Sequence, residues 1–512
     1  MDGADGPSVA LQSLAGNGEG VFEAAELGSR ISKERFDQEL PQLRVDLINA
    51  HFDLREADFP VLIVVVGDDR PGVNDLVNRL NEWMDARFIR THVFGELAEQ
   101  ERQRPRNWRY WRALPGRGQL AIYTGNFALD TIGERLRGVI DDSEFERRLD
   151  HMASFEQTLR DHGVLVLKFW IHISKKEFAR RIKKSLSKAG DGGRLDEMDH
   201  LVFGAYDDGR ILSERILRRT DSSHAPWYIV ESVDARYRDL TVAKAIRSAL
   251  LARLTQPLVP EINRVASSIP PPEHTILDNV DLTARLGESE YKTQRRQLQV
   301  RLRHLTLRAR AEGVPSVVVL EGWDAAGKGG VIRRLTRAMD VQDYQIVPVA
   351  APTDEELAHH YLWRFWRDLP GAGHMLIFDR SWYGRVLVER VEGLVPETAW
   401  RRAYTEINDF EDQIVRHGIP FCKFWLHIDR DEQLRRFQDR ENTPYKKYKI
   451  TDEDYRNSER WDDYRSAVNE MVQRTSTEFA PWTLVPANDK RFARVEVLRT
   501  ICDILTKRLR QR

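Results

Sequence analysis

The sequence predicts an α/β protein made of two tandem domains, each with a parallel sheet flanked by helices and a helical lid. Three observations lead to this fold class. Apolar runs of strand length alternate with longer helical patterns, aromatic motifs recur at a fixed interval, and one apolar run ends in a glycine-rich turn at residues 322–330. Parallel strands need crossover connections, so this alternation indicates a sheet that helices cover on both faces.

Three pairs of matched segments carry the tandem repeat. WRYWRALPG returns as WRFWRDLPG, KFWIHI returns as KFWLHI, and APW occurs in both halves. The pairs begin at Trp108 and Trp363, Lys168 and Lys423, and Ala225 and Ala480, always 255 residues apart (363 minus 108). A constant offset means that no net insertion separates the copies. We therefore expect one domain over 27–255 and a second over 280–512.

Two segments outside the repeats have biased compositions. Residues 1–26 begin with Gly, Ala, Ser and Asp in no periodic order, so we expect a flexible tail. Residues 256–279 contain five prolines, so we expect a stiff linker between the domains.

The second domain shows five apolar runs that we interpret as strands. They lie near 316–320, 344–350, 375–379, 420–428 and 482–486. Amphipathic helical patterns lie between them, for example at 399–417. Ligands of such sheets bind beyond the carboxyl ends of the strands. The glycine-rich turn follows the first strand, which places it at that edge.

The glycine-rich turn has the spacing Gly322-x4-Gly327-Lys328, which matches a loop that holds phosphate groups. Its glycines, with Gly329 after them, let the backbone approach an anion, and the helix that follows adds positive potential at its N-terminus. Lys328 supplies a point charge that can follow a phosphoryl group as it moves. The alternative is a strand–helix turn that binds nothing.

Two acidic residues indicate a metal ion at this turn. Gly329 stands where most such loops have the Ser or Thr that holds Mg²⁺, and Asp324 places a carboxylate where phosphates would lie. Asp379 ends the strand at 375–379, where a second metal ligand belongs. Asp324 and Asp379 together provide an oxygen shell suited to Mg²⁺, with Mn²⁺ as the alternative metal. The other interpretation of Asp379 is a helix N-cap.

Basic side chains follow at two places. Arg380 and Arg385 present planar forks for phosphate oxygens, unless they belong to a solvated face. Pro444 interrupts a charged stretch at about 430–460, where we expect a lid that closes on the phosphates and excludes water. The alternative is an ordinary charged surface helix. The lid residues expected to bind phosphate are Arg440, Lys446, Lys447 and Lys449.

The first domain lacks most of these charges. The pairs at the 255-residue offset are Lys328 and Val73, Asp379 and Thr124, Arg380 and Gly125, Lys446 and Asp191, and Asp324 and Asp69. Losing one preorganised charge typically costs about 10²–10³ in rate. We therefore expect 27–255 to be a degenerate, non-catalytic repeat and 280–512 to be the catalytic domain.

Composition limits the partners and the compartment. The 512 residues carry 79 Lys and Arg against 80 Asp and Glu, so no overall charge favours nucleic acid. The two cysteines lie in apolar segments, which fits a reducing compartment. No apolar run approaches a membrane span and no signal pattern opens the sequence. We therefore expect a cytoplasmic protein without membrane or nucleic-acid partners, and the sequence leaves a homo-oligomer open.

At these residues the chain resembles the second family of polyphosphate kinases. The loop EGWDAAGKGG, the DRSWY run at Asp379, and the lid with Pro444, Lys446 and Lys449 carry the resemblance. It covers the whole second half and, in degenerate form, the first, as in the two-domain subgroup. The resemblance implies P-loop kinase-like domains and Mg²⁺-dependent transfer of a terminal phosphoryl group from inorganic polyphosphate to AMP, which gives ADP.

The resemblance also implies roles. Lys328 and the lid lysines would contact phosphate, Asp324 would bind metal and orient the acceptor phosphate, and Asp379 and Arg380 would serve metal and phosphate. Tyr448 and Gly384 depart from the Trp and Asn that many members have, which bears on the acceptor more than on the reaction type. Three alternatives stay open: an ATP-dependent nucleoside or nucleotide kinase, a polyphosphate-driven kinase that acts on ADP, and a binding regulator without turnover.

Overall fold

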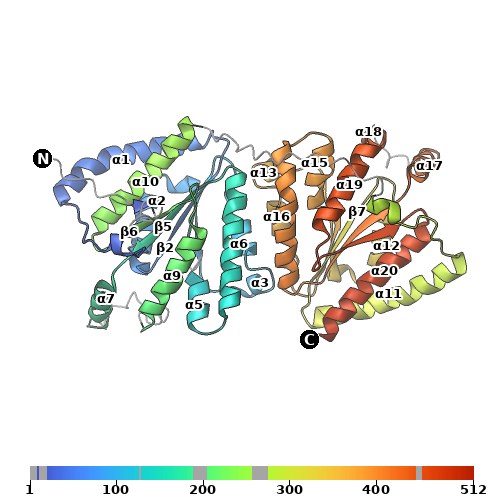
Figure 1. The fold of residues 1–512 in the computed structure, drawn as a ribbon, viewed down its shortest axis with the longest axis horizontal. Coiled ribbons are helices and arrows are strands. Elements are labelled where there is room, and N and C mark those ends of the chain that lie inside the picture. The colour runs from blue at the N-terminus through green and yellow to red at the C-terminus, as the bar shows by residue number, and fades with distance from the viewer. Residues whose placement is uncertain are drawn as a thin grey trace. The chain divides into compact units, whose positions relative to one another are not determined.

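A computed structural model describes residues 9–10, 20–125, 129–187, 204–256, 275–444 and 452–511. The chain forms two compact units. Unit 1 comprises Met1–Glu96, Ala113–Glu261 and Leu357–His360, and unit 2 comprises Leu97–Arg112, Ile262–Glu356 and Tyr361–Arg512. Each unit contains one sheet with helices on both faces (Figure 1).

The sheet of unit 1 has the strand order β1-β6-β5-β2-β4-β3. Strands β2 to β6 are parallel, and β1 adds an antiparallel edge on β6. The strands are β1 Val9–Ala10, β2 Val61–Gly67, β3 Ile89–Phe94, β4 Leu120–Gly125, β5 Leu165–His172 and β6 Trp227–Glu231.

The sheet of unit 2 has the order β11-β10-β7-β9-β8, and all its strands are parallel. The strands are β7 Ser316–Gly322, β8 Tyr344–Pro348, β9 Met375–Asp379, β10 Phe421–His427 and β11 Trp482–Pro486. The predicted fold class and the five predicted strands are confirmed. They were predictable because residues such as Val317–Leu320 are buried on both faces and therefore form continuous apolar runs.

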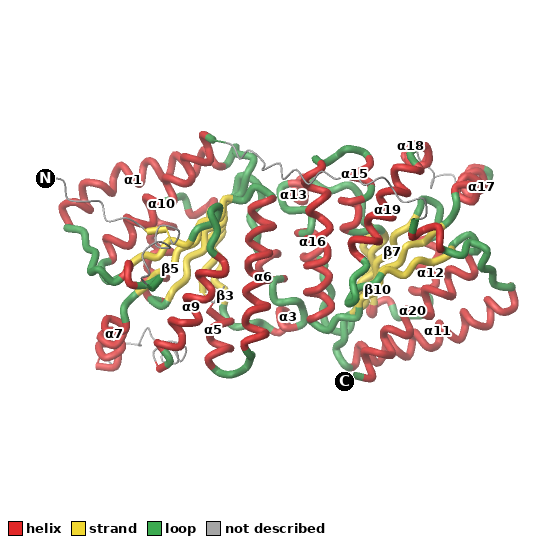
Figure 2. Tube along the Cα trace, viewed as in Figure 1, coloured by secondary structure: helices red, strands yellow, loops and turns green. Residues whose placement is uncertain are grey.

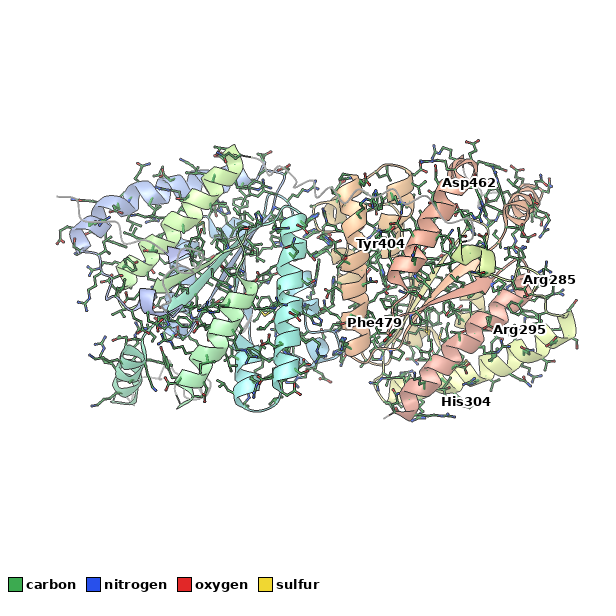
Figure 3. All side chains as sticks on the ribbon, viewed as in Figure 1. Arg285, Arg295, His304, Tyr404, Asp462 and Phe479 are labelled. Atoms are coloured by element: carbon green, nitrogen blue, oxygen red, sulfur yellow. The ribbon has the colours of Figure 1, made fainter. Side chains whose placement is uncertain are left out.

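The helices cover both faces of each sheet (Figure 2). In unit 1, α1, α2 and α10 pack with β2 in one apolar cluster, and α6 and α9 pack together beside β5. In unit 2, α11, α12 and α20 pack together, as do α15, α16 and α19. The side chains that fill the spaces between these elements are drawn in Figure 3.

The helices of unit 1 are α1 Lys33–Leu54, α2 Arg70–Trp83, α5 Leu129–Leu136, α6 Asp142–Asp161, α7 Lys175–Ser187, α9 Tyr206–Thr220 and α10 Ala235–Thr255. Those that lie mainly in unit 2 are α3 Glu99–Arg102, α4 Trp108–Arg112, α11 Glu288–Ala311, α12 Lys328–Thr336, α13 Asp354–Leu357, α14 Trp363–Arg367, α15 Val388–Val391, α16 Glu397–Arg416, α17 Arg430–Glu441, α18 Asp452–Glu459, α19 Trp461–Thr475 and α20 Lys490–Arg510. No helix in these described ranges is both long and apolar enough to span a bilayer.

The KFW motif builds the same buried polar cluster in both units. Lys423 on β10 donates to Glu411 and to the carbonyl of Thr475, at 2.6 Å each. Lys168 on β5 makes the same two bonds, at 2.5 Å, to the residues at the corresponding positions. A buried ammonium group needs such partners because desolvation is costly. The shared motif is therefore part of the scaffold.

The predicted tail is wrong for its last residues. Val21 and Phe22 are buried, and the Phe22 ring stacks on His172 with centroids 4.7 Å apart. Apolar burial of this kind fixes the segment from residue 20 onward. Most of the rest of the tail, the predicted linker at 257–274 and the lid residues 445–451 lie outside the described residues.

Candidate active site

The glycine-rich turn joins β7 to α12, and two of its glycines have backbone conformations that other residues avoid. Gly322 has a φ of +148°, and a Cβ added there would lie 2.7 Å from the carbonyl oxygen of Leu426. Gly327 has a φ of +116° and is the N-cap of α12. The first N–H groups of a helix lack intrahelical acceptors, so the start of α12 offers donors to an anion.

Lys328 is the first residue of α12, and its side chain reaches back across the turn. Its Nζ donates to the carbonyl oxygens of Gly322 at 2.6 Å and Trp323 at 3.3 Å. Burial lowers the pKa of Lys328, and the neighbouring carboxylate of Asp324 opposes that shift. The ammonium group is thereby held over the backbone of the turn.

Asp324 lies in the middle of the turn, between two donors. Its Oδ1 accepts from Arg380 at 3.1 Å, and its Oδ2 accepts from the side-chain amide of Asn457 at 3.0 Å. Burial alone would raise the pKa of Asp324, but the charges of Lys328 and Arg380 outweigh burial and lower it. The turn therefore presents an ionised carboxylate beside an ammonium group.

Asp379 and Arg380 lie at the carboxyl end of β9, beside the strand that carries the turn. Asp379 pairs in register with Leu320 of β7, and the backbone N–H of Arg380 donates to the Leu320 carbonyl at 3.1 Å. Arg380 has a φ of +65° and Ala325 a φ of +62°, conformations that cost non-glycine residues about 1–3 kcal/mol and cluster at functional sites. The helix-cap interpretation of Asp379 is wrong, because Ser381 caps the 3-10 helix at Trp382–Val386.

Glu321 is a second carboxyl group at the turn, and the loop motif does not single it out. It is 5% exposed, and its Oε1 accepts from the hydroxyl of Ser381 at 2.8 Å. Burial raises the pKa of Glu321, and Lys328 opposes the shift. The signal in the sequence is an acid at the end of an otherwise apolar strand.

The other expected phosphate ligands are placed less directly. Arg385 contacts Glu389 at 3.0 Å, and its guanidinium lies 4.4 Å from the ring centroid of Tyr361, so neither contact involves the turn. Arg440 lies near the end of α17 and is half-buried. The remaining three, Lys446, Lys447 and Lys449, fall outside the described residues. The structure thus brings together Gly322, Asp324, Gly327, Lys328, Gly329, Asp379 and Arg380.

Arg436 on α17 holds the turn, and sequence reasoning missed it. Its side chain is 2% exposed and donates to four backbone carbonyl groups. The acceptors are the carbonyl oxygens of Ala325, Ala326, Ala487 and Asn488, at 2.6–3.0 Å. The neighbouring Arg435 is 56% exposed. The sequence of the charged stretch does not distinguish the two arginines. Their burial differs only because one face of α17 packs against the turn.

Aromatic side chains fix the turn from its other side. Trp323 stacks on Trp461 of α19 with ring centroids 3.8 Å apart, and its indole N–H donates to Nδ1 of His427 at 3.0 Å. Burial lowers the pKa of His427 to about 4, so the ring is neutral and can accept this bond. Asn457 on α18 adds its contact to Asp324. The elements that follow the lid therefore hold the turn in place.

In unit 1 the corresponding turn is closed. Helix α2 begins at Arg70, three residues earlier than α12 at the 255-residue offset. Asp69 caps α2 by accepting from the N–H of Gly72 at 3.0 Å, and it also accepts from Arg181 at 2.6 Å. Asp69 is 1% exposed. Its carboxylate thus serves a cap and an ion pair, and an extra helical turn takes the place of the phosphate-binding backbone.

The fold and the turn of unit 2 define a class of protein. The glycine-rich turn leads from a buried parallel strand into a helix that starts with lysine, and the neighbouring strand ends in an aspartate. This is the arrangement of P-loop phosphotransferases. Comparison with known families gives the particular family. The chain belongs to the polyphosphate kinase 2 (PPK2) family, whose model matches residues 30–257 and again 285–512.

The chain is similar to several named proteins over nearly its whole length. It is 46% identical to a polyphosphate:AMP phosphotransferase of Pseudomonas aeruginosa over 490 residues, which cover 95% of this chain and 98% of that protein. It is 36% identical to a polyphosphate:AMP phosphotransferase of Acinetobacter johnsonii, across 90% of this chain and 95% of that one. A crystal structure of a Pseudomonas aeruginosa protein assigned to polyphosphate kinase 2 matches with a TM-score of 0.86 and 45% identity, covering 96% and 100% of the two chains.

Proposed function

We propose that the protein transfers a terminal phosphoryl group from inorganic polyphosphate to AMP and so forms ADP. The observation that carries this proposal is the turn of unit 2, where Lys328, Asp324 and Arg380 lie together at the end of a parallel sheet. The polyphosphate:AMP phosphotransferases named above, with which it shares up to 46% identity, support the choice of substrates.

The turn supplies positioning and charge neutralisation, which are most of what phosphoryl transfer requires. The N-terminal N–H groups of α12 and Lys328 bind the phosphate oxygens, and Arg380 neutralises the charge that spreads over them in the transition state. The acceptor oxygen of AMP is already anionic, so no strong general base is needed. Arg436 and Trp323 keep the turn in the conformation that these contacts require.

Asp324 and Asp379 fit a Mg²⁺ ion, with Mn²⁺ as the alternative. Asp324 is ionised and offers hard oxygen ligands, and Asp379 ends the neighbouring strand. The described residues contain no group of three or more metal-type side chains. Mg²⁺ is usually bound through one or two carboxylates together with substrate phosphates and water. When bound, the metal would neutralise and align the phosphate oxygens.

We also propose that unit 2 is the catalytic unit and that unit 1 is non-catalytic. The buried cap at Asp69, and Val73 in the place of Lys328, support this division. The lid residues Arg440, Lys446, Lys447 and Lys449, together with Arg385, would add phosphate contacts around a long polyanionic donor.

The test is a comparison of donors. The protein is incubated with AMP, Mg²⁺ and either polyphosphate or ATP, and the nucleotides are separated by ion-exchange chromatography. ADP should accumulate with polyphosphate. If ATP supports turnover of AMP and polyphosphate does not, the protein is an ATP-dependent nucleotide kinase. A parallel incubation contains ADP in place of AMP, and faster turnover of ADP would identify a polyphosphate-driven kinase that acts on ADP.

A further inference from the structure

Three helices of unit 2 bring arginine side chains together around one tyrosine. Arg295 of α11, Arg334 of α12 and Arg494 of α20 lie close to the hydroxyl group of Tyr291. The guanidinium group of Arg295, which Figure 3 labels, lies 5.2 Å from the centroid of the Tyr291 ring. Burial would raise the pKa of Tyr291, but its interactions with the three arginines outweigh burial and lower it. We call these four residues the arginine cluster.

The arginine cluster adjoins the helix that starts at the glycine-rich turn. The guanidinium group of Arg494 lies beside Gly330, where an added Cβ would be 3.4 Å from Nη2. Arg334 donates from Nη1 to the carbonyl oxygen of Gly330 at 3.1 Å. Gly330 comes two residues after Lys328, which is less than one helical turn. The cluster therefore lies next to the residues that we expect to bind phosphate.

The positive charge of the cluster has no carboxylate to balance it. No ion pair joins Arg295, Arg334 or Arg494 to an acidic side chain in the part of the chain that the structure describes. Burial lowers the pKa of Arg494, and the like charges of Arg334 and Arg333 lower it further. The acidic residues of the three helices have other partners: Glu288 pairs with Lys292 and Arg491, Glu290 accepts from Gln294, Glu496 pairs with Arg499, and Asp503 pairs with Arg301. Positive charge that no side chain neutralises attracts anions from solution.

The three arginines present a surface that suits a phosphate group. Arg295, Arg334 and Arg494 are each partly exposed, and the neighbouring Arg333 is exposed. The Nε atoms of Arg295 and Arg334 are buried, so a ligand would meet the terminal Nη atoms. A guanidinium group is planar and offers paired N–H donors that match two oxygens of a phosphate group. Forks from three helices can hold an anion that carries several oxygens.

Unit 1 has lost the cluster and reversed its charge. The pairs at the 255-residue offset are Arg494 and Asp239, Gly330 and Asp75, Arg295 and Leu40, and Tyr291 and Phe36. The arginine at the position of Arg334 is kept as Arg79, and it lies 3.8 Å from Asp239. By contrast, the buried lysine cluster of the scaffold is the same in both units. The arginine cluster thus disappears together with Lys328 and the open turn, as expected if it binds an anion and is not needed for the fold.

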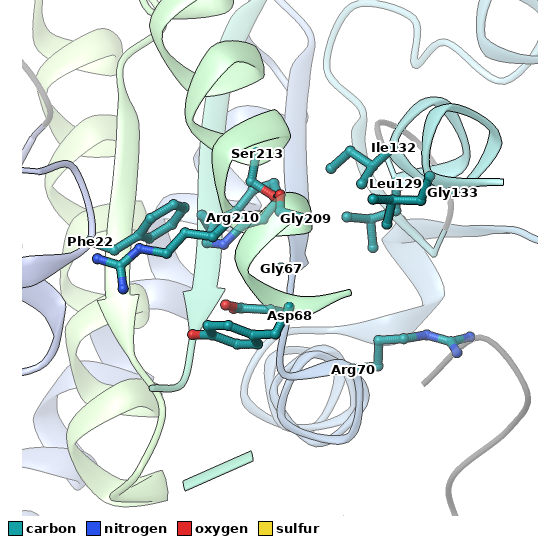
Figure 4. A pocket seen from close by; sticks show the side chains of 13 residues that line it. Phe22, Gly67, Asp68, Arg70, Leu129, Ile132, Gly133, Gly209, Arg210 and Ser213 are labelled. Atoms are coloured by element: carbon teal, nitrogen blue, oxygen red, sulfur yellow. The ribbon is translucent and has the colours of Figure 1, made fainter. Parts of the chain in front are cut away.

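The pocket of unit 1 does not take over this role. It lies at the carboxyl edge of the sheet beside the closed turn, with a volume of about 630 Å³ including its open mouth (Figure 4). Its walls are mainly apolar and include Leu129 and Ile132. Arg210, which also lines it, pairs with Glu23 at 2.8 Å and with Glu26 at 3.3 Å. The arginine cluster of unit 2 is therefore the better site for an anion.

We propose that the arginine cluster is a second phosphate-binding site of unit 2, separate from the glycine-rich turn. Its ligand is a phosphate group with at least two free oxygens. Such a group has two sources, either a distant part of a polyphosphate chain whose end lies at the turn, or free orthophosphate. The first source rests on the proposed function, whereas the second does not.

The test measures the affinity of the full-length protein for long-chain polyphosphate and for orthophosphate. Isothermal titration calorimetry is used at low ionic strength and without nucleotide, because salt screens partly exposed charges. The first variant is Arg494→Gln, which also removes a like charge from the cluster and should not destabilise the fold. Arg295→Leu is an independent second variant that introduces the residue of unit 1. The matched control is Arg499→Gln, which removes the same charge from the same helix at a position where Glu496 balances it.

Arg494→Gln and Arg295→Leu should each bind at least one of the two ligands about 10-fold or more weakly than wild type, because hydrogen bonds to a charged group are lost. Arg499→Gln should bind both ligands as wild type does. A loss confined to polyphosphate identifies the donor chain as the ligand, and a loss that includes orthophosphate identifies a site for free phosphate. Equal affinities of all four proteins, or an equal loss in Arg499→Gln, would overturn the proposal.

ADP formation distinguishes the two sources independently. If the donor chain extends to the cluster, Arg494→Gln should raise KM for long-chain polyphosphate about 10-fold, and the effect should fall on KM more than on kcat, because the reacting groups lie at the turn. If the cluster takes free phosphate only, KM for polyphosphate should stay at the wild-type value. Failure of the wild type to form ADP would refute the proposed function, and the binding comparison would still decide the arginine cluster.

Discussion

Replacing Arg436 tests how the turn is held. Arg436→Met keeps the aliphatic stem but removes the donors to four backbone carbonyl groups and the ion pair with Glu432. Each hydrogen bond to a charged group contributes about 1.5–3 kcal/mol. The four do not add, because they belong to one guanidinium group and are lost together. Glu432 keeps its pair with Arg435, but each buried carbonyl group left without a donor costs about 1–3 kcal/mol, so we expect unit 2 to be destabilised by at least that amount.

We expect Arg436→Met to lower the catalytic rate even under conditions in which the protein stays folded. Ala325 and Ala326 belong to the turn, so their release lets the phosphate-binding backbone move, and a misplacement of about 1 Å can cost about 10²-fold in rate. We expect kcat/KM for AMP to fall by about 10² or more, with kcat carrying most of the decrease. Arg436→Lys should recover only part of it, since an ammonium group cannot match the fork of a guanidinium.

Two controls isolate the effect. Arg435→Met changes the exposed neighbour on the same helix, and exposed ion pairs contribute about 0–1 kcal/mol. Arg181→Met changes the residue of unit 1 at the corresponding position, which contacts Asp69. Both variants should keep wild-type kcat/KM, measured by ADP formation from AMP and polyphosphate. Wild-type kcat/KM in a folded Arg436→Met protein, with unfolding followed by circular dichroism, would refute the assigned role.

Three further predictions concern the metal site, the glycine-rich turn and a buried histidine of unit 1. Asp379→Asn should lower kcat by about 10² or more at a fixed Mg²⁺ concentration and weaken the Mg²⁺ dependence of the rate. Near-normal activity of this variant would show that Asp379 is not a metal ligand. Gly322→Ala should destabilise unit 2 by about 1–3 kcal/mol in urea unfolding, because its Cβ would lie 2.7 Å from the Leu426 backbone. Gly329→Ala should leave the stability unchanged, because its Cβ would point into open space. Equal stabilities of the two variants would refute the packing argument. Burial would lower the pKa of His172, but the charge of Asp68 and the hydrogen bonds to Asp68 and Glu26 raise it to about 9. The protonated ring therefore stabilises the fold fully below about pH 6.5, and this contribution is lost as the pH rises through 9. Over that range the unfolding free energy of wild type relative to His172→Gln should fall by at most about 3 kcal/mol, and a difference that does not change with pH would contradict this prediction.

The sequence predicts the scaffold well because its signals are local. Strands buried on both faces form apolar runs, and a turn with φ near +148° at Gly322 and +116° at Gly327 requires glycine at fixed spacing. The burial of Phe22 escapes the same reasoning, because a short segment rich in small residues carries no periodicity of its own.

The site residues that the sequence does not reveal depend on tertiary approach. The local sequence does not predict that Arg436 is buried while its neighbour Arg435 is exposed. It also does not predict that Asn457 contacts Asp324, which lies 133 positions earlier in the chain. The pocket of unit 1 escapes sequence reasoning for another reason. It is lined by small side chains at positions such as Gly209, and the sequence does not show that these positions face one cavity.

The central claim is that phosphoryl transfer to AMP occurs at one turn, in unit 2. The most direct test is the rate of ADP formation from AMP and polyphosphate by the full-length Lys328→Ala protein, with its fold checked by circular dichroism. The account predicts that the rate falls by at least about 10²–10³, because unit 1 has Val73 and a closed turn and cannot compensate. A folded Lys328→Ala protein that retains more than about a tenth of the wild-type rate would contradict it.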